Sequence, residues 1–189
     1  MRFIKRSLDQ GGKLTKEEEE QLNVELLKRG IAYAESLGGQ LMMNPSSSAT
    51  GLYGQLYNEI KDLDFMSGVS REDFSKDLDL QNRVFDMRVE EGINAPSLRR
   101  NAMELTKEYK PQLGDAWVFS LDDVAAISNY LGRQGAREYF ASLRDGTEFK
   151  VAGVNKPVSD YLDKYHEGRD MVDYYGGGRM RPIKKTFNK

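Results

Sequence analysis

The sequence has no cysteine and a single histidine, His166, among its 189 residues. Without cysteine there can be no disulfide, thiolate zinc site, iron–sulfur cluster or cysteine nucleophile. One histidine cannot form a histidine cluster around a metal and is a poor basis for a catalytic triad, so we interpret His166 as a surface or helix-end residue. We therefore expect no metal and no cofactor, and any chemistry has to use carboxylates, hydroxyls, amides or tyrosine.

Long apolar runs are also missing. No segment approaches the roughly 18 apolar residues of a transmembrane helix. The opening residues, MRFIKRSLDQGGK, lack the apolar core of a secretory signal. We therefore expect no membrane span and synthesis in the cytoplasm.

Neither sign of charge dominates the chain as a whole. The sequence has 28 Lys and Arg against 30 Asp and Glu, a net charge of −2, so we predict no nucleic-acid partner. The total conceals an asymmetry, because residues 176–189 carry five basic residues and no acid, which leaves −7 on the remainder. We divide the chain into a basic arm over residues 1–15, a folded domain over 16–170 and a Gly-rich basic tail over 171–189.

The spacing of apolar residues predicts a mainly helical single domain. Thr15 and Glu18 have the T-x-x-E form of a capping box, so the first helix is expected to begin there and to run to about Leu37. Gly38 and Gly39 then stop it, and residues 38–68 have the composition of turns with at most small strands. Further helices are predicted around residues 84–91, from Pro96-Ser97 to Pro111, from a second capping pattern at Ser120 and Asp123 to Gly132, over about 134–144, and from Pro157 onward.

The end of the first predicted helix and the segment after it carry the most informative pattern. E-S at residues 35–36 is followed by N-P at 44–45, a run of small residues and G-L-Y-G-Q at 51–55. This order resembles the active-site signature of lytic transglycosylases of the lysozyme-like superfamily, which ends in G-L-[MY]-Q. Residues 125–140, AAISNYLGRQGAREYF, look like the A-x-x-x-H-F-L-G-x-x-G-A-x-x-[FY] segment of bacterial and phage versions, and residues 157–165 look like their last helix.

The resemblance covers roughly residues 20–168. It implies a mainly α fold of the α+β lysozyme-like type, with a small irregular or β segment after the first long helix. It also implies an enzyme that cuts the glycan strand of peptidoglycan between N-acetylmuramic acid and N-acetylglucosamine, with no cofactor.

The position of Glu35 in the sequence suits a general acid. This residue stands at the C-terminal end of an apolar-faced helix, where the chain opens at Gly38 and Gly39. Burial and the negative end of the helix dipole both favour a protonated carboxyl there. Such surroundings raise the pKa of a carboxyl toward neutral pH, which general-acid catalysis requires.

The resemblance implies a mechanism with one catalytic carboxyl. Glu35 would protonate the glycosidic oxygen and then, as a carboxylate, remove the proton of the muramoyl C6 hydroxyl, which closes a 1,6-anhydro ring. An ordinary glycosidase needs a second carboxylate about 5 to 9.5 Å away. Glu59, Asp62 and Asp64 are candidates, but their mixed-charge segment is typical of a solvated surface, so we assign none.

Ser36, Tyr53 and Gln55 are predicted to bind substrate. The resemblance implies that the Ser36 hydroxyl orients the acid and the sugar; the alternative is a helix-end residue that bonds the backbone. Tyr53 and Gln55 would line the sugar cleft, with the Gln55 amide on an N-acetyl group or a ring hydroxyl. Gly54 is an extra residue relative to the family signature, so either the loop bulges there or Gln55 points elsewhere.

Asn129 and Tyr130 stand where the relatives have an aromatic or a His-aromatic pair near the acid, and are also predicted to bind substrate. Tyr130 is expected to stack on a sugar or to hydrogen-bond Glu35; the alternative is a core aromatic on an amphipathic helix. Asn129 replaces the histidine of the family, a second departure from its pattern. We expect the carboxyl of Glu35 to face a groove that it shares with Tyr53 and Tyr130.

The resemblance and the lack of an export signal together indicate a phage virion component, in a tail or an internal core. Such a protein is made in the host cytoplasm and acts in the periplasm or cell wall, and its basic arm and tail would dock to other virion or tail proteins. A secretion apparatus or release as an endolysin are alternative routes to the wall. Two other functions stay open: a catalytically degenerate structural protein of a virion, favoured by Gly54 and Asn129, and a hydrolytic muramidase that uses water.

Overall fold

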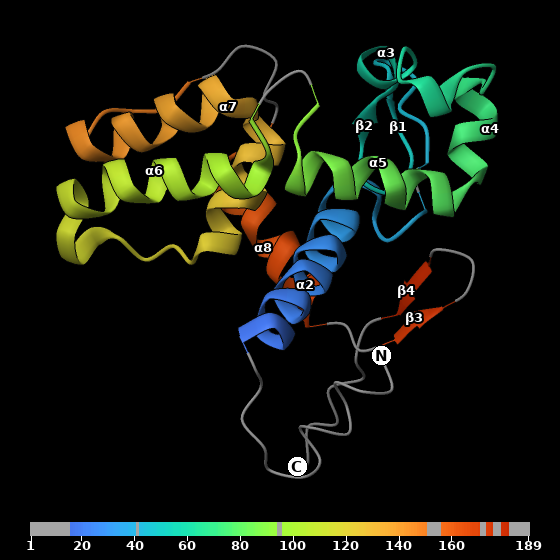
Figure 1. Ribbon diagram of the computed structural model, residues 1–189. Helices are drawn as coiled ribbons and strands as arrows, with labels where there is room; N and C mark the ends of the chain where they lie inside the picture. Colours follow the sequence, from blue (N-terminus) through green and yellow to red (C-terminus); the bar gives the residue numbers. More distant parts are fainter. Residues whose placement is uncertain are drawn as a thin grey trace, which may run out of the picture.

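In the computed structural model the described part of the chain folds mainly into α-helices, with two short antiparallel hairpins (Figure 1). The structure describes residues 16–40, 42–93, 96–150, 156–170, 173–175 and 179–181, and within these ranges the side chains of residues 24–170. The prediction of a mainly helical chain with a small β segment after the first long helix is confirmed.

The helices are α2 (Lys16–Ser36), α3 (Tyr57–Ile60), α4 (Arg71–Lys76), α5 (Leu78–Glu90), α6 (Leu98–Leu113), α7 (Leu121–Asp145) and α8 (Val158–Arg169), with 3₁₀ turns η1 (Asp64–Met66) and η2 (Gly114–Ala116). The hairpins pair β1 (Ala49–Thr50) with β2 (Gln55–Leu56) and β3 (Asp173–Tyr175) with β4 (Arg179–Arg181).

Helix α2 ends close to the predicted residue, because the backbone becomes left-handed just after Ser36. Leu37, Gly38 and Gly39 have φ angles of 52°, 66° and 91°, a region that costs energy for a residue with a Cβ but not for glycine. The reversal leaves Glu35 and Ser36 in the last turn of the helix, at the negative end of its dipole. The proposed capping residue at position 15 and the basic arm lie outside the described residues.

The start and the break of α7 follow the predicted signals. The Asp123 amide donates to the Ser120 hydroxyl and the Ser120 amide donates to the Asp123 carboxylate, which completes the capping box. The helix continues to Asp145, but Gly132 is non-helical, with φ 70° and ψ 172°. The two helices predicted on either side of Gly132 are therefore the two halves of α7, and the left-handed Gly146 ends the second half.

Three boundaries differ from the prediction. Helix α5 begins at Leu78, ahead of the predicted residue 84, where the Asp77 carboxylate accepts a hydrogen bond from the Leu80 amide. Helix α6 runs through Pro111 to Leu113, because a proline in the last turn removes only one backbone hydrogen bond of the helix. Pro157 is the N-cap of α8 rather than its first residue. Helices α3 and α4 were not predicted; α4 begins where the Ser70 hydroxyl accepts a hydrogen bond from the Asp73 amide.

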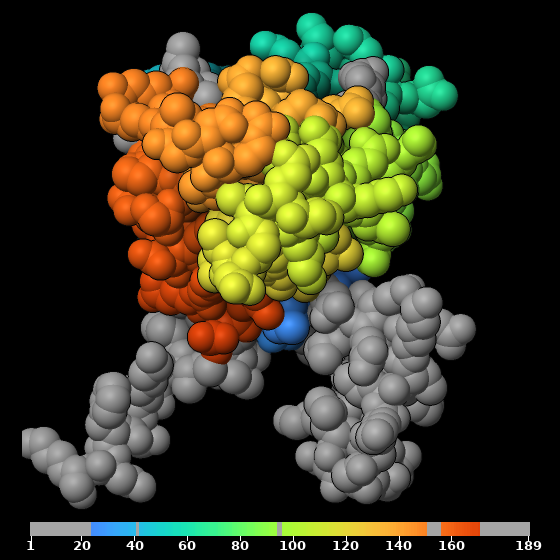
Figure 2. Space-filling view, turned by 90° about the vertical axis from the view of Figure 1, so that its left-hand side faces the viewer, coloured from blue at the N-terminus to red at the C-terminus, as the bar shows by residue number. Residues whose placement is uncertain are grey.

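Two hydrophobic clusters support the fold. The larger joins α2, α5, α6, α7 and α8 around buried side chains such as Ile31 and Phe140. The smaller lies between α5 and the segment we call the small lobe, residues 42–77 with β1, β2, α3 and α4, and consists of Ile60, Met66, Phe74 and Val84. Figure 1 places the small lobe beside α6 and α7, with α2 and α8 below both. Figure 2 looks onto another side, where α6 and the second half of α7 lie side by side and α8 adjoins them.

Helices α2 and α8 cross at close range because each has a glycine at the crossing. A Cβ on Gly30 would lie 2.3 Å from the ring of Tyr165, and one on Gly168 would lie 2.5 Å from the Cβ of Tyr33. The crossing fixes α8 against the helix that carries Glu35. Over the described ranges, no helix has the length and the apolar content needed to cross a bilayer.

Candidate active site

Glu35 lies where three segments of the chain meet. Its Oε1 atom accepts one hydrogen bond from Asn129 Nδ2 of α7 and one from the Tyr161 hydroxyl of α8, each 3.1 Å long. The turn between β1 and β2 brings Gly54 against the other oxygen, Oε2. No residue in the described part of the chain donates a hydrogen bond to Oε2. One carboxyl oxygen is thus held by two donors while the other borders the turn.

Gly54 can take this place only because it has no side chain. Its φ is +61°, and a Cβ there would lie 2.7 Å from Oε2 of Glu35. The amide of Gly54 donates to the carbonyl of Gly51 at 3.2 Å, which closes a tight turn. The residue that departs from the family signature therefore allows the backbone to approach the acid.

Burial raises the pKa of Glu35 to about 7. The hydrogen bonds from Tyr161 and Asn129 and the positive charges of Arg88 and Lys156 lower it, but the loss of solvent outweighs them. The raised pKa predicted from the sequence is confirmed. A carboxyl with this pKa is about half protonated at neutral pH, so it can release a proton and take one back under the same conditions.

A cavity of about 290 Å³ opens beside Glu35. We call it the Glu35 cavity; its volume is near the lower end of small-molecule sites, which span roughly 300 to 1,000 Å³. Among the described residues, Glu35 is the only acidic or basic one in its lining, so Glu59, Asp62 and Asp64 do not contribute to it. The lining comes from the end of α2, the loop before β1 and the first hairpin: Glu35, Met42, Met43, Asn44, Pro45, Ala49, Thr50, Gly51 and Gly54.

Arg71 holds the outer wall of the Glu35 cavity in place. Its Nε donates to Thr50 Oγ1 at 2.6 Å, and its Nη2 donates to the carbonyl oxygens of Asn44, Ser47 and Ala49 at 2.8, 2.9 and 3.0 Å. One guanidinium thereby ties the first residue of α4 to the loop and the hairpin. Sequence reasoning missed this residue, because nothing local distinguishes it from other arginines at a helix start.

Ser36 bonds the backbone, which is the alternative considered above for this residue. Its hydroxyl is fully buried, lies 2.8 Å from the carbonyl oxygens of both Ala32 and Leu52, and accepts from the amide of Gly39 at 3.0 Å. The hydroxyl has no capacity left for a sugar. Its contribution is to fasten the turn after β1 to the end of α2.

Tyr53 does not line the Glu35 cavity, contrary to the prediction. Only 3% of the residue is exposed, its ring stacks on Phe85 with 4.2 Å between centroids, and its hydroxyl donates to Asn82. The reason is the tight turn at Gly54, which directs the preceding side chain into the main core.

Gln55 also points away from the acid. Of the two alternatives given for the extra glycine, the structure therefore has the one in which Gln55 points elsewhere. It is fully buried, and its Nε2 donates to the carbonyl of Gln81 at 3.3 Å. The side chain of Gln81 in turn accepts from the Leu52 amide at 2.7 Å and donates to the Phe74 carbonyl at 2.7 Å. Gln55 and Gln81 thus fasten the hairpin to α5.

Of the two predicted residues of α7, Asn129 hydrogen-bonds the acid and Tyr130 does not. Asn129 donates the hydrogen bond to Glu35, whereas the Tyr130 hydroxyl donates to the Lys156 carbonyl at 3.0 Å. Tyr130 instead stacks on Tyr161, with 4.2 Å between ring centroids and 10° between planes, and so supports the second donor to the acid. Neither the Glu35 cavity nor the lobe cleft, as lined by the described residues, includes Tyr53 or Tyr130, so the expected groove shared with Glu35 is not found there. Nothing in the sequence singles out Tyr161 within the last predicted helix, since helical spacing does not reveal a partner 126 positions away.

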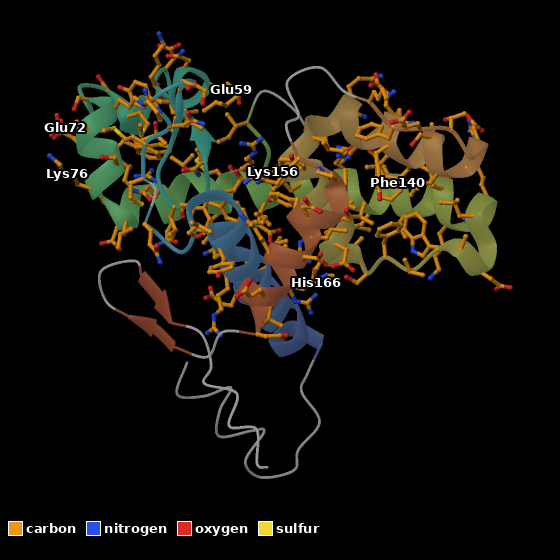
Figure 3. The ribbon with its side chains drawn as sticks, turned by 180° about the vertical axis from the view of Figure 1, so that it is seen from behind. Glu59, Glu72, Lys76, Phe140, Lys156 and His166 are labelled. Carbon is orange, nitrogen blue, oxygen red and sulfur yellow. The ribbon has the colours of Figure 1, made fainter. Side chains whose placement is uncertain are left out.

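A second cavity of about 300 Å³ separates the small lobe and α5 from α6 and α7. We call it the lobe cleft. Figure 3 shows Lys156 between the small lobe and α6/α7, with Glu59 at the edge of the small lobe on that side. The lobe cleft is lined by Gln55, Glu59, Ile60, Val84 and Arg88 on one side and by Ile93, Pro96, Leu98, Asn101, Ser128, Gly132 and Arg133 on the other.

His166 pairs with a second buried carboxyl, far from the acid in the sequence. Its Nε2 lies 2.7 Å from Oδ1 of Asp123, and its side chain is 47% exposed. Arg169 Nη1 is 3.8 Å from the same oxygen. The interpretation of His166 as a helix-end surface residue agrees with this position. In the described ranges no three acids or histidines are grouped so that they could hold a metal.

The arrangement around Glu35 allows a single carboxyl to exchange a proton with a molecule in the adjoining cavity. Comparisons of the chain with family models, with curated proteins and with solved structures found no match. Function therefore has to follow from the site itself.

Proposed function

We propose that this protein is a peptidoglycan lytic transglycosylase with Glu35 as its catalytic residue. The observation that carries the proposal is the state of that carboxyl, which is buried at a helix C-terminus, has a pKa of about 7 and borders a cavity. No second acid from the part of the chain that the structure describes lines the Glu35 cavity. This supports a reaction in which one carboxyl acts first as acid and then as base, whereas ordinary glycosidases use two carboxylates.

In the first step the proton leaves from Oε2. Asn129 and Tyr161 both donate to Oε1, so that oxygen is the acceptor and the proton of the neutral acid belongs on Oε2, beside Gly54. Glu35 protonates the oxygen that links N-acetylmuramic acid to N-acetylglucosamine. The bond to the muramoyl C1 breaks, and the leaving sugar departs with a hydroxyl.

In the second step Glu35 is a carboxylate and acts as a base. The two donors on Oε1 and the charges of Arg88 and Lys156 stabilise this form. The carboxylate takes the proton of the muramoyl C6 hydroxyl while the oxygen of that hydroxyl bonds to C1. The acid is restored, a C1–O6 bond replaces the glycosidic bond, and no water is consumed.

We extend the proposal to the fold and its setting. A long helix that ends at an acid, followed by a small hairpin and then by packed helices, supports assignment to the lysozyme-like superfamily. The resemblance of residues 125–140 to phage versions supports a virion component that acts on the cell wall. Its partners would be the peptidoglycan strand and other virion or tail proteins, bound through residues 1–15 and 171–189. Of these two segments the structure describes only β3 and β4.

The proposal is tested by clearing of purified peptidoglycan with the full chain, Glu35→Gln and Glu72→Gln. Glu72 is a matched control, because its side chain is 69% exposed, it pairs with Lys76, and Figure 3 places both at the outer edge of the small lobe. We expect the wild type and Glu72→Gln to clear equally, and Glu35→Gln to lose about 100- to 10,000-fold in rate. Clearing by Glu35→Gln, or none by the folded wild type over a broad pH range, would contradict the proposal.

A structural virion protein without activity is the second candidate. It is favoured by Tyr53 and Gln55, which are buried away from the Glu35 cavity where the resemblance implies sugar contacts. A folded wild-type chain that leaves every peptidoglycan preparation intact would favour this candidate. A hydrolytic muramidase is distinguished by its products, because hydrolysis leaves a reducing muramic acid that is heavier by one water.

A further inference from the structure

The lobe cleft differs from the Glu35 cavity in the charges that line it. It contains Arg88, Arg133 and the exposed Glu59. Arg133 is paired, with its Nη2 3.3 Å from Oε2 of Glu104. Arg88 is half-buried and forms no ion pair or hydrogen bond with any residue in the described ranges. A half-buried guanidinium with no direct ion-pair partner favours an anion beside it.

Two buried amide oxygens belong to residues of the same lining. Gln55 Oε1 and Asn101 Oδ1 have no hydrogen-bond donor among the described residues. Only 0% and 3% of these residues is exposed. Their nitrogen atoms are already used, by the Gln81 carbonyl and by Ser128 Oγ. An unpaired buried acceptor costs about 1–3 kcal/mol, so both oxygens favour an N–H or O–H donor.

Consecutive residues of the first hairpin line the two cavities, Gly54 the Glu35 cavity and Gln55 the lobe cleft. Arg88 is also close enough to Glu35 for its charge to act on the carboxyl. A long substrate cut at Glu35 therefore has its neighbouring groups within reach of the lobe cleft.

We propose that the lobe cleft binds a carboxylate-bearing N-acyl part of the substrate, with Arg88 as the partner of the carboxylate and Gln55 and Asn101 as acceptors for N–H groups. This inference rests on the proposed function, under which the group is the lactyl-linked peptide of the muramoyl unit. That peptide offers both features, amide N–H groups and a free carboxylate, whereas the bare glycan offers only the first.

Occupation of the cleft has a consequence for the acid. Arg88 and Lys156 both lower the pKa of Glu35. A carboxylate bound to Arg88 offsets one of these two charges, since Arg133 is already paired and Glu59 is exposed. Binding of a peptide-bearing strand thus favours the protonated form of Glu35, which the first step requires.

The test is calorimetric binding to the full chain carrying Glu35→Gln, which measures affinity without turnover. The probes are muramyl dipeptide, which has amides and a carboxylate, and chitotriose, which is N-acetylated and neutral. Arg88→Gln is compared with Arg83→Gln, a charge-matched control on the same helix whose side chain is exposed and lines neither cavity. Arg88→Lys keeps the charge and serves as a second variant, and thermal unfolding establishes that each variant is folded.

We expect Arg88→Gln to weaken muramyl dipeptide binding about tenfold or more and chitotriose binding less than about twofold. Arg88→Lys recovers most of the affinity, and Arg83→Gln changes neither probe. The inference is overturned if Arg88→Gln matches Arg83→Gln, if it weakens both probes equally, or if muramyl dipeptide does not bind. Arg88-dependent binding without clearing by the wild type would refute only the proposed function. Clearing without Arg88-dependent binding would refute only this inference.

Discussion

Glu35 and Asp123 are both carboxylates withdrawn from solvent at the end of a long helix, and their surroundings drive their pKa values in opposite directions. Glu35 stands in the last turn of α2, where the helix dipole opposes a negative charge, and burial raises its pKa to about 7. Asp123 stands in the first turn of α7, where the dipole favours a negative charge.

Burial opposes the ionisation of Asp123 as well, but its hydrogen bonds outweigh burial. His166 and the hydroxyl and amide of Ser120 contact its carboxylate, and together they lower its pKa. Glu35 has two neutral donors on one oxygen and none from the described residues on the other. The comparison teaches that burial alone does not mark a reactive acid. What distinguishes Glu35 is burial without a direct cationic partner, next to a cavity.

The largest expected difference between the two carboxyls is in catalysis. Glu35→Gln removes the transferable proton and lowers the rate of peptidoglycan clearing about 100- to 10,000-fold. Asp123→Asn, assayed well below its unfolding temperature, keeps the rate within about twofold, because Asp123 lines neither cavity. Rates of clearing measured on the same peptidoglycan preparation check this contrast. Equal losses of rate in the two variants would contradict it.

The second expected difference is in stability. At neutral pH, replacing Glu35 is expected to stabilise the fold, whereas replacing Asp123 is expected to destabilise it. The raised pKa of Glu35 contributes stability below the unfolded-state value of 4.5, and this contribution disappears as the pH rises through about 7. Glu35→Gln is therefore expected to be more stable than the wild type by up to about 3 kcal/mol above pH 7 and to match it near pH 4. Chemical denaturation across this pH range measures the difference.

Asp123→Asn is expected to destabilise the fold by about 2 kcal/mol at neutral pH, because it weakens the helix cap and leaves His166 and Arg169 without their partner. In the wild type the pKa of Asp123 is lowered from 3.8. The wild type is therefore more stable than the variant above this pH, and the difference in stability declines as the pH falls through the lower folded-state pKa. Parallel stability curves for the two variants would contradict the assignment of opposite shifts.

A third prediction concerns the close approach of the hairpin to the acid. Gly54→Ala places a Cβ 2.7 Å from Glu35 Oε2 at a φ of +61°, and is expected to cost about 2 kcal/mol in stability and to reduce clearing at least about tenfold. Gly68→Ala is the control, since Gly68 has a φ of +77° but nothing near its Cβ position. If both variants lose the same stability and neither loses activity, the contact with the carboxyl has no role.

The smallest effect is expected from Tyr161→Phe. It removes one of the hydrogen bonds that lower the pKa of Glu35 while keeping the ring that stacks on Tyr130. The rate kcat/KM for soluble glycan fragments falls in the wild type as the pH rises through about 7, because the acid must be protonated. In Tyr161→Phe this decline is expected at higher pH, with a rate change below about tenfold. An unmoved or lowered decline would contradict the role of Tyr161.

Local signals in the sequence predicted the longer helices and the acid, but not the short helices α3 and α4. The Gly38-Gly39 stop, the capping box at Ser120 and the proline at position 157 are short-range features, and the structure has a helix boundary at each. Glu35 was predicted from the E-S and G-L-Y-G-Q pattern, with its place at the end of a helix as physical support, and both are local properties of the sequence.

The partners of the acid could not be predicted in the same way. Tyr161 and Asn129 reach Glu35 from 126 and 94 positions away, through packing that no local pattern specifies. The resemblance led to Tyr53 as a sugar contact, but the extra glycine at position 54 changes the turn, so the ring of Tyr53 packs on Phe85 instead. A one-residue difference in a tight turn is thus enough to redirect a functional prediction.

The central claim is that Glu35 alone supplies both proton transfers and that water takes no part. Mass spectrometry of the fragments released from peptidoglycan in water enriched in ¹⁸O tests it most directly. The account predicts fragments that end in 1,6-anhydro-N-acetylmuramic acid without ¹⁸O, and their absence with Glu35→Gln. Reducing muramic acid ends that carry ¹⁸O would contradict it.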